Sequence, residues 1–142
     1  EDNLLWVLLF FGGVLGGIAV LLSAWGAHGL EDLFITSPQD RFSFNYATNF
    51  QLFHALLLIS LVFFMISSGT RTILLLVSSL FLIIGILLFS FPIYFRIIGE
   101  YSELSWLTPI GGICFFLAWS LISMLSIFKI ITIRKTRSKS EL

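Results

Sequence analysis

Five polar side chains stand at the ends of long apolar stretches and are the residues that could do chemistry. They are His28, Glu31, Gln51, His54 and Arg96. Their imidazole, carboxylate, amide and guanidinium groups can form hydrogen bonds, and some can hold a proton or ligate a metal. Because lipid offers no hydrogen-bond partner, such groups must face one another or a wet cavity. We therefore expect them to form one inward-facing polar cluster in the outer half of a helix bundle.

The two histidines also allow a more specific chemistry, in which His28 and His54 ligate one haem iron between neighbouring helices. A zinc site is not expected, because two histidines and distant carboxylates lack zinc-ligand spacing. No serine or threonine lies in a nucleophile motif with a histidine and an acid. The lone Cys114 lies inside an apolar run and is typical of a small buried hydrophobic residue. The sequence thus predicts no cofactor, no metal and no enzymatic activity, with the haem pair as the alternative.

The composition indicates the medium in which these residues must work. Hydrophobic residues make up 58% of the chain and charged residues 11%, against about 45–50% and about 25% in soluble domains. A soluble protein of this size could not cover so much apolar surface. The formal net charge is zero, which gives no reason to expect a nucleic-acid partner. The chain is predicted to be an integral membrane protein in contact with the lipid bilayer.

Four apolar stretches are long enough to cross a bilayer, which takes about 20 helical residues. The predicted spans are residues 4–27, 46–67, 73–95 and 108–133 of a single domain, 1–142. The chain shows no strand alternation of the kind that indicates a β-barrel. We predict an all-α fold, a compact bundle of four transmembrane helices.

The positions of lysine and arginine predict the orientation. One side of the predicted membrane has six basic residues: Arg71, Lys129, Arg134, Lys135, Arg137 and Lys139. The other side has only Arg41 and Arg96. This asymmetry places both termini in the cytoplasm and makes residues 134–142 a basic cytoplasmic tail.

Small residues predict how the helices pack. The first span holds two overlapping pairs at four-residue spacing, Gly12 with Gly16 and Gly13 with Gly17. Helices in lipid associate through close backbone packing, which such residues permit. We expect this stripe to contact the fourth span at Gly111, Gly112 and Ala118. The alternative is a contact with a second copy or with a different protein.

Three motifs resemble a known family. "SAWGAHGL", "FQLFHALLL" and "TPIGGICFFLAW" are similar to the signatures of the domain of unknown function 423 family. That family comprises YgdD-like small inner-membrane proteins, with the eukaryotic transmembrane protein 256 as a relative. The similarity extends from Phe11 to about Trp119. It implies a four-helix protein of the bacterial inner membrane, and it implies no activity.

The function most consistent with these features is that of an accessory, scaffold or assembly subunit of a larger membrane complex. Its partners would be other membrane protein subunits, reached through helix–helix contacts. The alternative is a small-solute or ion transport component that works as a homo-oligomer.

Overall fold

The computed structural model describes residues 3–140, with side chains described to Arg137. Nearly all of this part is helical, and no strand occurs in it. The helices are α1 (Asn3–His28), α2 (Glu31–Thr36), α3 (Pro38–Ser68), α4 (Ile73–Gly99) and α5 (Leu107–Ser140). All except the short α2 are long and apolar enough to cross a membrane. The predicted all-α fold with four transmembrane helices is confirmed.

Local sequence explains where the helices begin and end. Pro38 occupies the first turn of α3, where its missing N–H group costs no hydrogen bond. At the other end of α3, Gly69 has a φ of 63°, a left-handed conformation that glycine adopts without strain. The side chain of Thr72 then accepts a hydrogen bond from the Leu75 N–H at the start of α4. A very short connection therefore returns the chain into the membrane.

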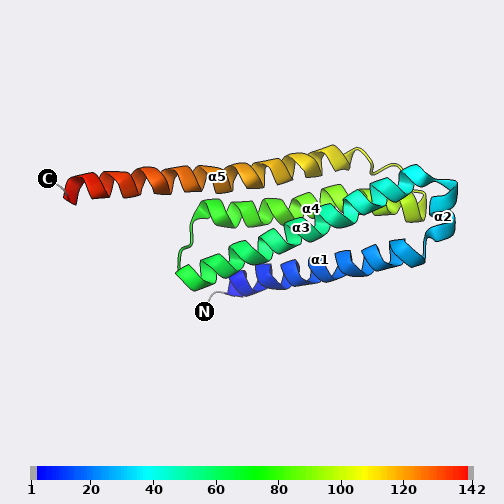
Figure 1. The fold of residues 1–142 in the computed structure, drawn as a ribbon, viewed down its shortest axis with the longest axis horizontal. Coiled ribbons are helices and arrows are strands. Elements are labelled where there is room, and N and C mark those ends of the chain that lie inside the picture. Colours follow the sequence, from blue (N-terminus) through cyan, green and yellow to red (C-terminus); the bar gives the residue numbers. More distant parts are fainter. Residues whose placement is uncertain (1–2, 141–142) are drawn as a thin grey trace.

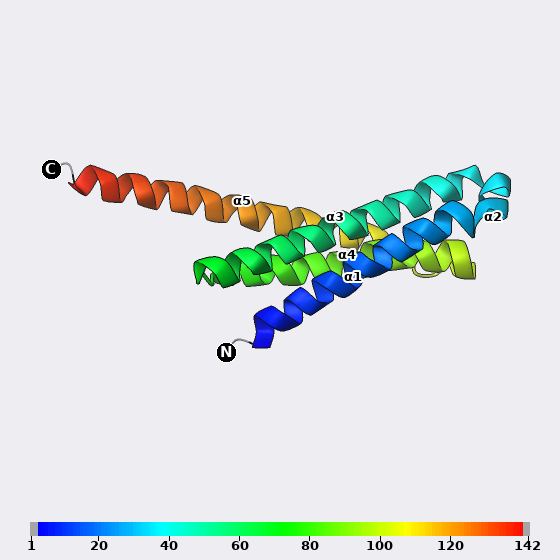
Figure 2. The ribbon, with the colours of Figure 1, turned by 60° about the horizontal axis from the view of Figure 1, so that its bottom comes forward.

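The four long helices lie side by side in the order α1, α3, α4, α5, with α1 and α5 at opposite edges (Figures 1 and 2). We call the end with α2 and the α4–α5 connection the α2 end. The opposite end, with the α3–α4 connection, is the Arg71 end. The described chain begins and ends toward the Arg71 end, and α5 continues past the other helices there (Figure 1).

Helices α3 and α5 extend furthest beyond the predicted spans. Helix α3 begins at Pro38, eight residues before the predicted start at residue 46, and carries the polar residues Asp40 and Arg41 in its first turns. His54 consequently lies near the middle of α3. Helix α5 runs to Ser140, so the predicted basic tail is helical as far as it is described. The side chain of Lys139 and residues 141–142 lie outside the described part.

The interior has two apolar regions. The larger is built from α1, α3, α4 and α5 and includes Leu8, Leu58, Met65, Leu82 and Phe115. The smaller, at the α2 end, joins Phe34, Phe44, Ala47, Tyr94 and Ile97. Buried polar side chains from α3 and α4 lie among these apolar residues.

Candidate functional site

Gln51 is the centre of the best-connected polar group in the interior. Its side chain is fully buried. Its Nε2 donates to the carbonyl oxygen of Leu15 at 2.8 Å, and its Oε1 accepts from the hydroxyl of Tyr94 at 2.9 Å. These partners lie on α1 and α4, so one amide joins three membrane helices.

Glycines on α1 bring its backbone within reach of Gln51. A Cβ atom on Gly12 would lie 2.8 Å from Cγ1 of Ile59, and one on Gly16 would lie 3.7 Å from Cβ of Ala55. Both neighbours are on α3, so α1 and α3 pack closely on either side of Leu15. The Gln51 amide can therefore bond a main-chain carbonyl directly, without a side chain on α1 to meet it.

A second buried hydrogen bond joins α3 to α4 close to Gln51. The Ser90 hydroxyl donates to the carbonyl oxygen of Ala47 at 2.8 Å, and its side chain is fully buried. Ala47 precedes Gln51 by one helical turn. The two contacts together fix how far α3 can slide along α4.

His54 connects α3 to α5 and is 7% exposed. Its Nδ1 lies 2.7 Å from the carbonyl oxygen of Phe50, and its Nε2 lies 3.3 Å from Nε1 of Trp119. A carbonyl can only accept and an indole N–H can only donate. The partners therefore select the neutral ring with its proton on Nδ1. The ring also stacks on Phe115, with centroids 3.7 Å apart.

The structure separates the five residues that the sequence suggested as one cluster. Gln51 and His54 are buried and adjacent on α3, whereas His28 and Glu31 are exposed at the α2 end. Arg96 lies near the last turn of α4 and pairs with Asp40. A single outer cluster is therefore not present in the described chain.

The distance between the histidines argues against a shared iron. His28 lies thirteen residues beyond Leu15 on α1, about 20 Å along the axis at 1.5 Å per residue. His54 lies next to Gln51, which bonds Leu15. Both ring nitrogens of His54 also face protein partners. Among the described residues, no group of three histidine, cysteine or acidic side chains could hold a metal ion.

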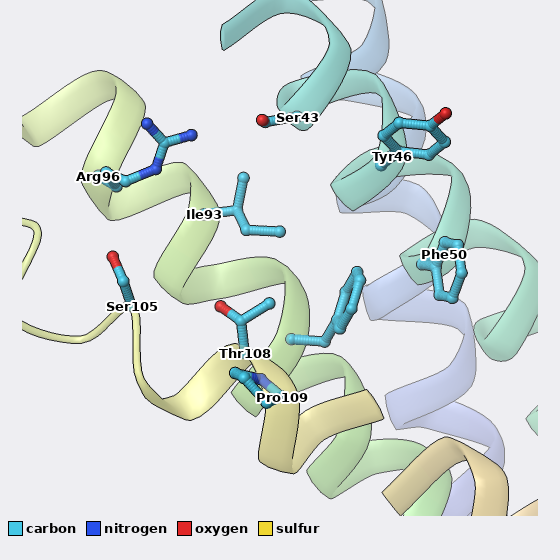
Figure 3. A pocket seen from close by; sticks show the side chains of 9 residues that line it. Ser43, Tyr46, Phe50, Ile93, Arg96, Ser105, Thr108 and Pro109 are labelled. Atoms are coloured by element: carbon cyan, nitrogen blue, oxygen red, sulfur yellow. The ribbon is translucent and has the colours of Figure 1, made fainter. Parts of the chain in front are cut away.

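A groove of about 580 Å³ opens between α3, α4 and the start of α5 at the α2 end (Figure 3). Phe50 and Phe89, whose rings stack 4.8 Å apart, form its apolar part. Its polar lining includes Ser43, Arg96, Ser105 and Thr108. The Ser105 hydroxyl is buried and has no hydrogen-bond partner within the described part of the chain.

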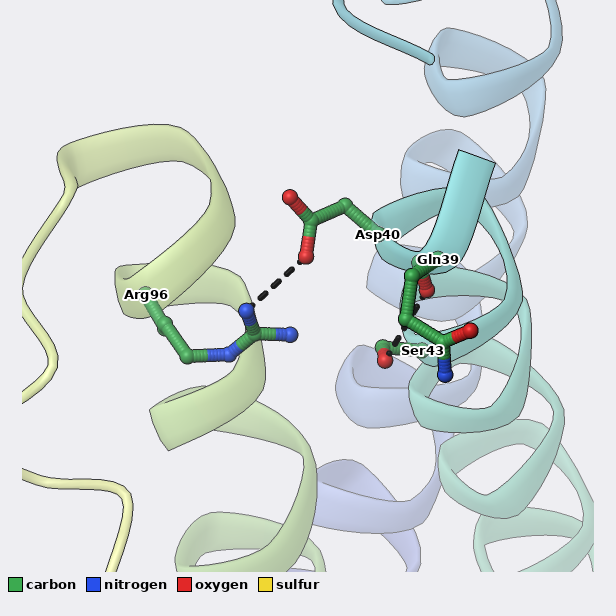
Figure 4. A network of polar contacts seen from close by, with 4 residues as sticks. All are labelled: Gln39, Asp40, Ser43 and Arg96. Atoms are coloured by element: carbon green, nitrogen blue, oxygen red, sulfur yellow. Dashed lines mark hydrogen bonds and ion pairs between the residues drawn. The ribbon is translucent and has the colours of Figure 1, made fainter. Parts of the chain in front are cut away.

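An ion pair lies at the rim of this groove. One terminal nitrogen of Arg96, Nη1, lies 2.8 Å from Oδ1 of Asp40, with side chains 35% and 24% exposed (Figure 4). Nearby, the Ser43 hydroxyl donates to the carbonyl oxygen of Gln39 (Figure 4). Arg96 uses one of its five N–H donors on Asp40, and its other side faces the groove (Figure 3).

The glycines pack differently from the prediction. Gly12 and Gly16 face α3, and a Cβ atom on Gly111 would overlap the backbone of α4, 2.7 Å from the carbonyl carbon of Leu88. The expected contact between the α1 glycines and the fourth span is therefore wrong. A Cβ atom on Gly13, Gly17 or Gly112 would meet no atom of the described residues within 4 Å. On α1, the pair Gly12 and Gly16 is thus packed against α3, whereas the pair Gly13 and Gly17 is open.

Four of the residues that complete these contacts were not singled out from the sequence. They are Asp40, Ser90, Tyr94 and Trp119. Tyrosine and tryptophan carry a polar group that needs a partner when it is buried. Tyr94 and Trp119 inside predicted spans were therefore a usable signal for partners of Gln51 and His54.

Comparisons with known proteins identify a family of membrane proteins. A model of the family described as "Protein of unknown function (DUF423)" matches residues 22–112, a segment that includes Gln51, His54 and Arg96. A UPF0382 membrane protein of Staphylococcus epidermidis is 35% identical over 80% of this chain and 88% of its own. The UPF0382 membrane protein YwdK of Bacillus subtilis is 31% identical over 82% and 92%. The UPF0382 inner membrane protein YgdD of Escherichia coli is 30% identical over 80% and 84%. No solved structure matches the chain.

Proposed function

Because the chain belongs to the DUF423 family, whose description names no activity, we propose a function from its own surfaces. We propose that it is a non-enzymatic accessory or scaffold subunit that binds other membrane proteins through helix–helix contacts. The resemblance that three sequence motifs suggested is confirmed by the family match. The expected multi-pass inner-membrane location is confirmed by the four membrane-spanning helices and by the inner-membrane relative from Escherichia coli.

The open glycines of α1 carry this proposal. Gly13 and Gly17 lie four residues apart and face away from the bundle, and a side chain at either position would meet nothing within 4 Å. We call these two residues the open glycine pair. The neighbouring pair, Gly12 and Gly16, already packs against α3. The open glycine pair therefore offers the same close-approach geometry on a side that none of the described helices occupies.

Membrane energetics explain why such a surface favours a protein partner. Lipid tails are as apolar as leucine, so helices gain association energy from close contact and not from leaving the solvent. Two glycines at four-residue spacing form a shallow recess into which another backbone can pack.

The interior supports a scaffold more than a conducting pore, because Gln51, His54 and Ser90 are all bonded to protein atoms.

We further propose that both termini face the cytoplasm. The Arg71 end holds the basic residues Arg71, Lys129, Arg134, Lys135 and Arg137. The α2 end holds only Arg41 and Arg96. Excess lysine and arginine mark the cytoplasmic side of membrane proteins.

Native mass spectrometry of the protein extracted from its own membrane in mild detergent tests the scaffold proposal. We expect the wild type to carry other polypeptides, and Gly13→Leu and Gly17→Leu to release them. The bundle itself should be unaffected, with an unchanged melting temperature. Gly112→Leu is the matched control, because it places the same side chain at an open glycine on another helix.

Two results would contradict the proposal. One is a bare monomer in mild detergent, which leaves the open glycine pair facing lipid. The other is a complex made only of copies of this chain, which supports the homo-oligomeric alternative. Retention of the partner by both leucine variants would show that another surface binds it.

A further inference from the structure

We propose that the groove between α3, α4 and α5 binds a zwitterionic phospholipid with a primary ammonium group, of the phosphatidylethanolamine type. The phosphate would contact Arg96 and the ammonium would contact Asp40. This inference is independent of the proposed scaffold role, because the groove and the open glycine pair involve different residues.

The groove lies at the depth where lipid headgroups are found. Its polar residues come from the first turns of α3, the last turn of α4, and the α4–α5 connection with the start of α5, all at the α2 end of the bundle. Tyr46, Tyr101 and Trp106 are each more than 60% exposed in these segments. Exposed tyrosine and tryptophan are enriched at membrane–water interfaces. A ligand in the groove would therefore have its polar part at the interface and its apolar part in the bilayer.

The groove is lined by apolar and polar side chains, which match the acyl chains and the headgroup of a phospholipid. Phe50 and Phe89 supply apolar contact for an acyl chain, and Phe50 is itself 37% exposed. Ser43, Ser105 and Thr108 supply hydroxyl groups around Arg96 (Figure 3). The volume of about 580 Å³ lies within the usual range of ligand sites, about 300–1,000 Å³.

Two unused polar groups fit a phosphate or an ester oxygen. The buried Ser105 hydroxyl has no hydrogen-bond partner among the described residues, although a buried polar group normally has one. Arg96 is only partly exposed and commits one N–H group to Asp40. A guanidinium group binds phosphate oxygens with paired N–H donors. An acceptor in the groove would satisfy both residues.

The Arg96–Asp40 ion pair favours a zwitterionic headgroup over an anionic one. Asp40 neutralises Arg96, so the rim of the groove has no excess positive charge to hold an anionic lipid. The α2 end as a whole has five acidic residues and two basic ones. The acidic residues are Glu31, Asp32, Asp40, Glu100 and Glu103. A zwitterionic headgroup matches a neutral pair, with each of its charges facing the opposite charge. A primary ammonium can donate to the Asp40 carboxylate, whereas a choline group has no N–H to donate.

Lipid titration of the delipidated protein, followed by native mass spectrometry, tests the site. The probes are phosphatidylethanolamine, phosphatidylcholine and phosphatidylglycerol with identical acyl chains. We expect phosphatidylethanolamine to bind about tenfold more tightly than the other two, as one charge-assisted hydrogen bond would give. Asp40→Asn should invert the preference toward phosphatidylglycerol, because Arg96 is then left without a countercharge.

Three further variants separate binding from folding. Arg96→Gln should weaken all three lipids, and Arg41→Gln, an exposed arginine one residue from Asp40, should change none. Ser43 lines the groove, and its hydroxyl bonds only within its own helix. Ser43→Leu should therefore fill the groove and abolish the preference for phosphatidylethanolamine, with an unchanged melting temperature. Equal binding of the three lipids, or an unchanged preference in Asp40→Asn, would overturn the proposal. That result would mean that the groove holds only the bulk bilayer lipid.

Discussion

Replacing Gln51 by methionine tests whether one buried amide holds three helices together. Methionine keeps the length of the side chain and removes both its donor and its acceptor. The hydrogen bonds to Leu15 and Tyr94 are then lost. At about 0.6 kcal/mol for an interhelical hydrogen bond in a membrane, the two amount to about 1.2 kcal/mol. The buried Tyr94 hydroxyl also loses its acceptor on Gln51, which adds about 1–3 kcal/mol. We expect Gln51→Met to lower the free energy of unfolding by about 2–4 kcal/mol.

Tyr94→Phe makes this expectation specific, because its effect depends on the residue at position 51. In the wild type it removes one hydrogen bond and should destabilise the bundle by about 1–2 kcal/mol. In the Gln51→Met background the bond to position 51 is already gone, so Tyr94→Phe should cost less than in the wild type. Tyr46→Phe is the control, because Tyr46 is 62% exposed and should be neutral in both backgrounds.

The free energies can be measured by titrating sodium dodecyl sulfate into mixed micelles and following circular dichroism. The decisive quantity is the interaction energy of the double-mutant cycle. If Tyr94→Phe costs the same with glutamine or methionine at position 51, the two side chains do not interact. The conclusion that Gln51 connects α1, α3 and α4 through hydrogen bonds would then be refuted.

Two other contacts give predictions of the same kind. His54→Ala removes the link to Trp119 and the stacking on Phe115, so it should lower the melting temperature and leave the visible absorption spectrum featureless. A lost haem band in this variant would contradict the structural role. Gly111→Ala should destabilise the packing of α5 on α4 by more than 1 kcal/mol, because the new Cβ overlaps the Leu88–Phe89 backbone. Gly112→Ala should be neutral in the same thermal assay, since its Cβ meets nothing.

The number of helices and the burial of Gln51 could be predicted because both follow from one-dimensional rules. A run of about 20 apolar residues is long enough to span the bilayer, and an amide inside such a run must face a partner. These inferences need no knowledge of which helix lies next to which.

The helix neighbours could not be predicted, because lipid-facing and core-facing sides of these helices are both apolar. The glycines of α1 pointed to close packing without indicating that α3, and not α5, would supply it. The partners of Gln51 and His54 depend on the same neighbours. Tyr94 and Trp119 lie 43 and 65 residues further along the chain, beyond any local pattern.

The bond from Gln51 to the Leu15 carbonyl has a consequence for how the chain enters the membrane during synthesis. Helix α1 is made first and can satisfy its own backbone, so it can enter lipid alone. Helix α3 follows with an amide that lipid cannot satisfy, and the acceptor it needs is on the helix already inserted. The hydroxyl of Tyr94 and the indole of Trp119 arrive later, on α4 and α5. The Gln51 amide thus finds one partner on a helix that is already inserted, and the remaining polar groups of α3 wait for α4 and α5.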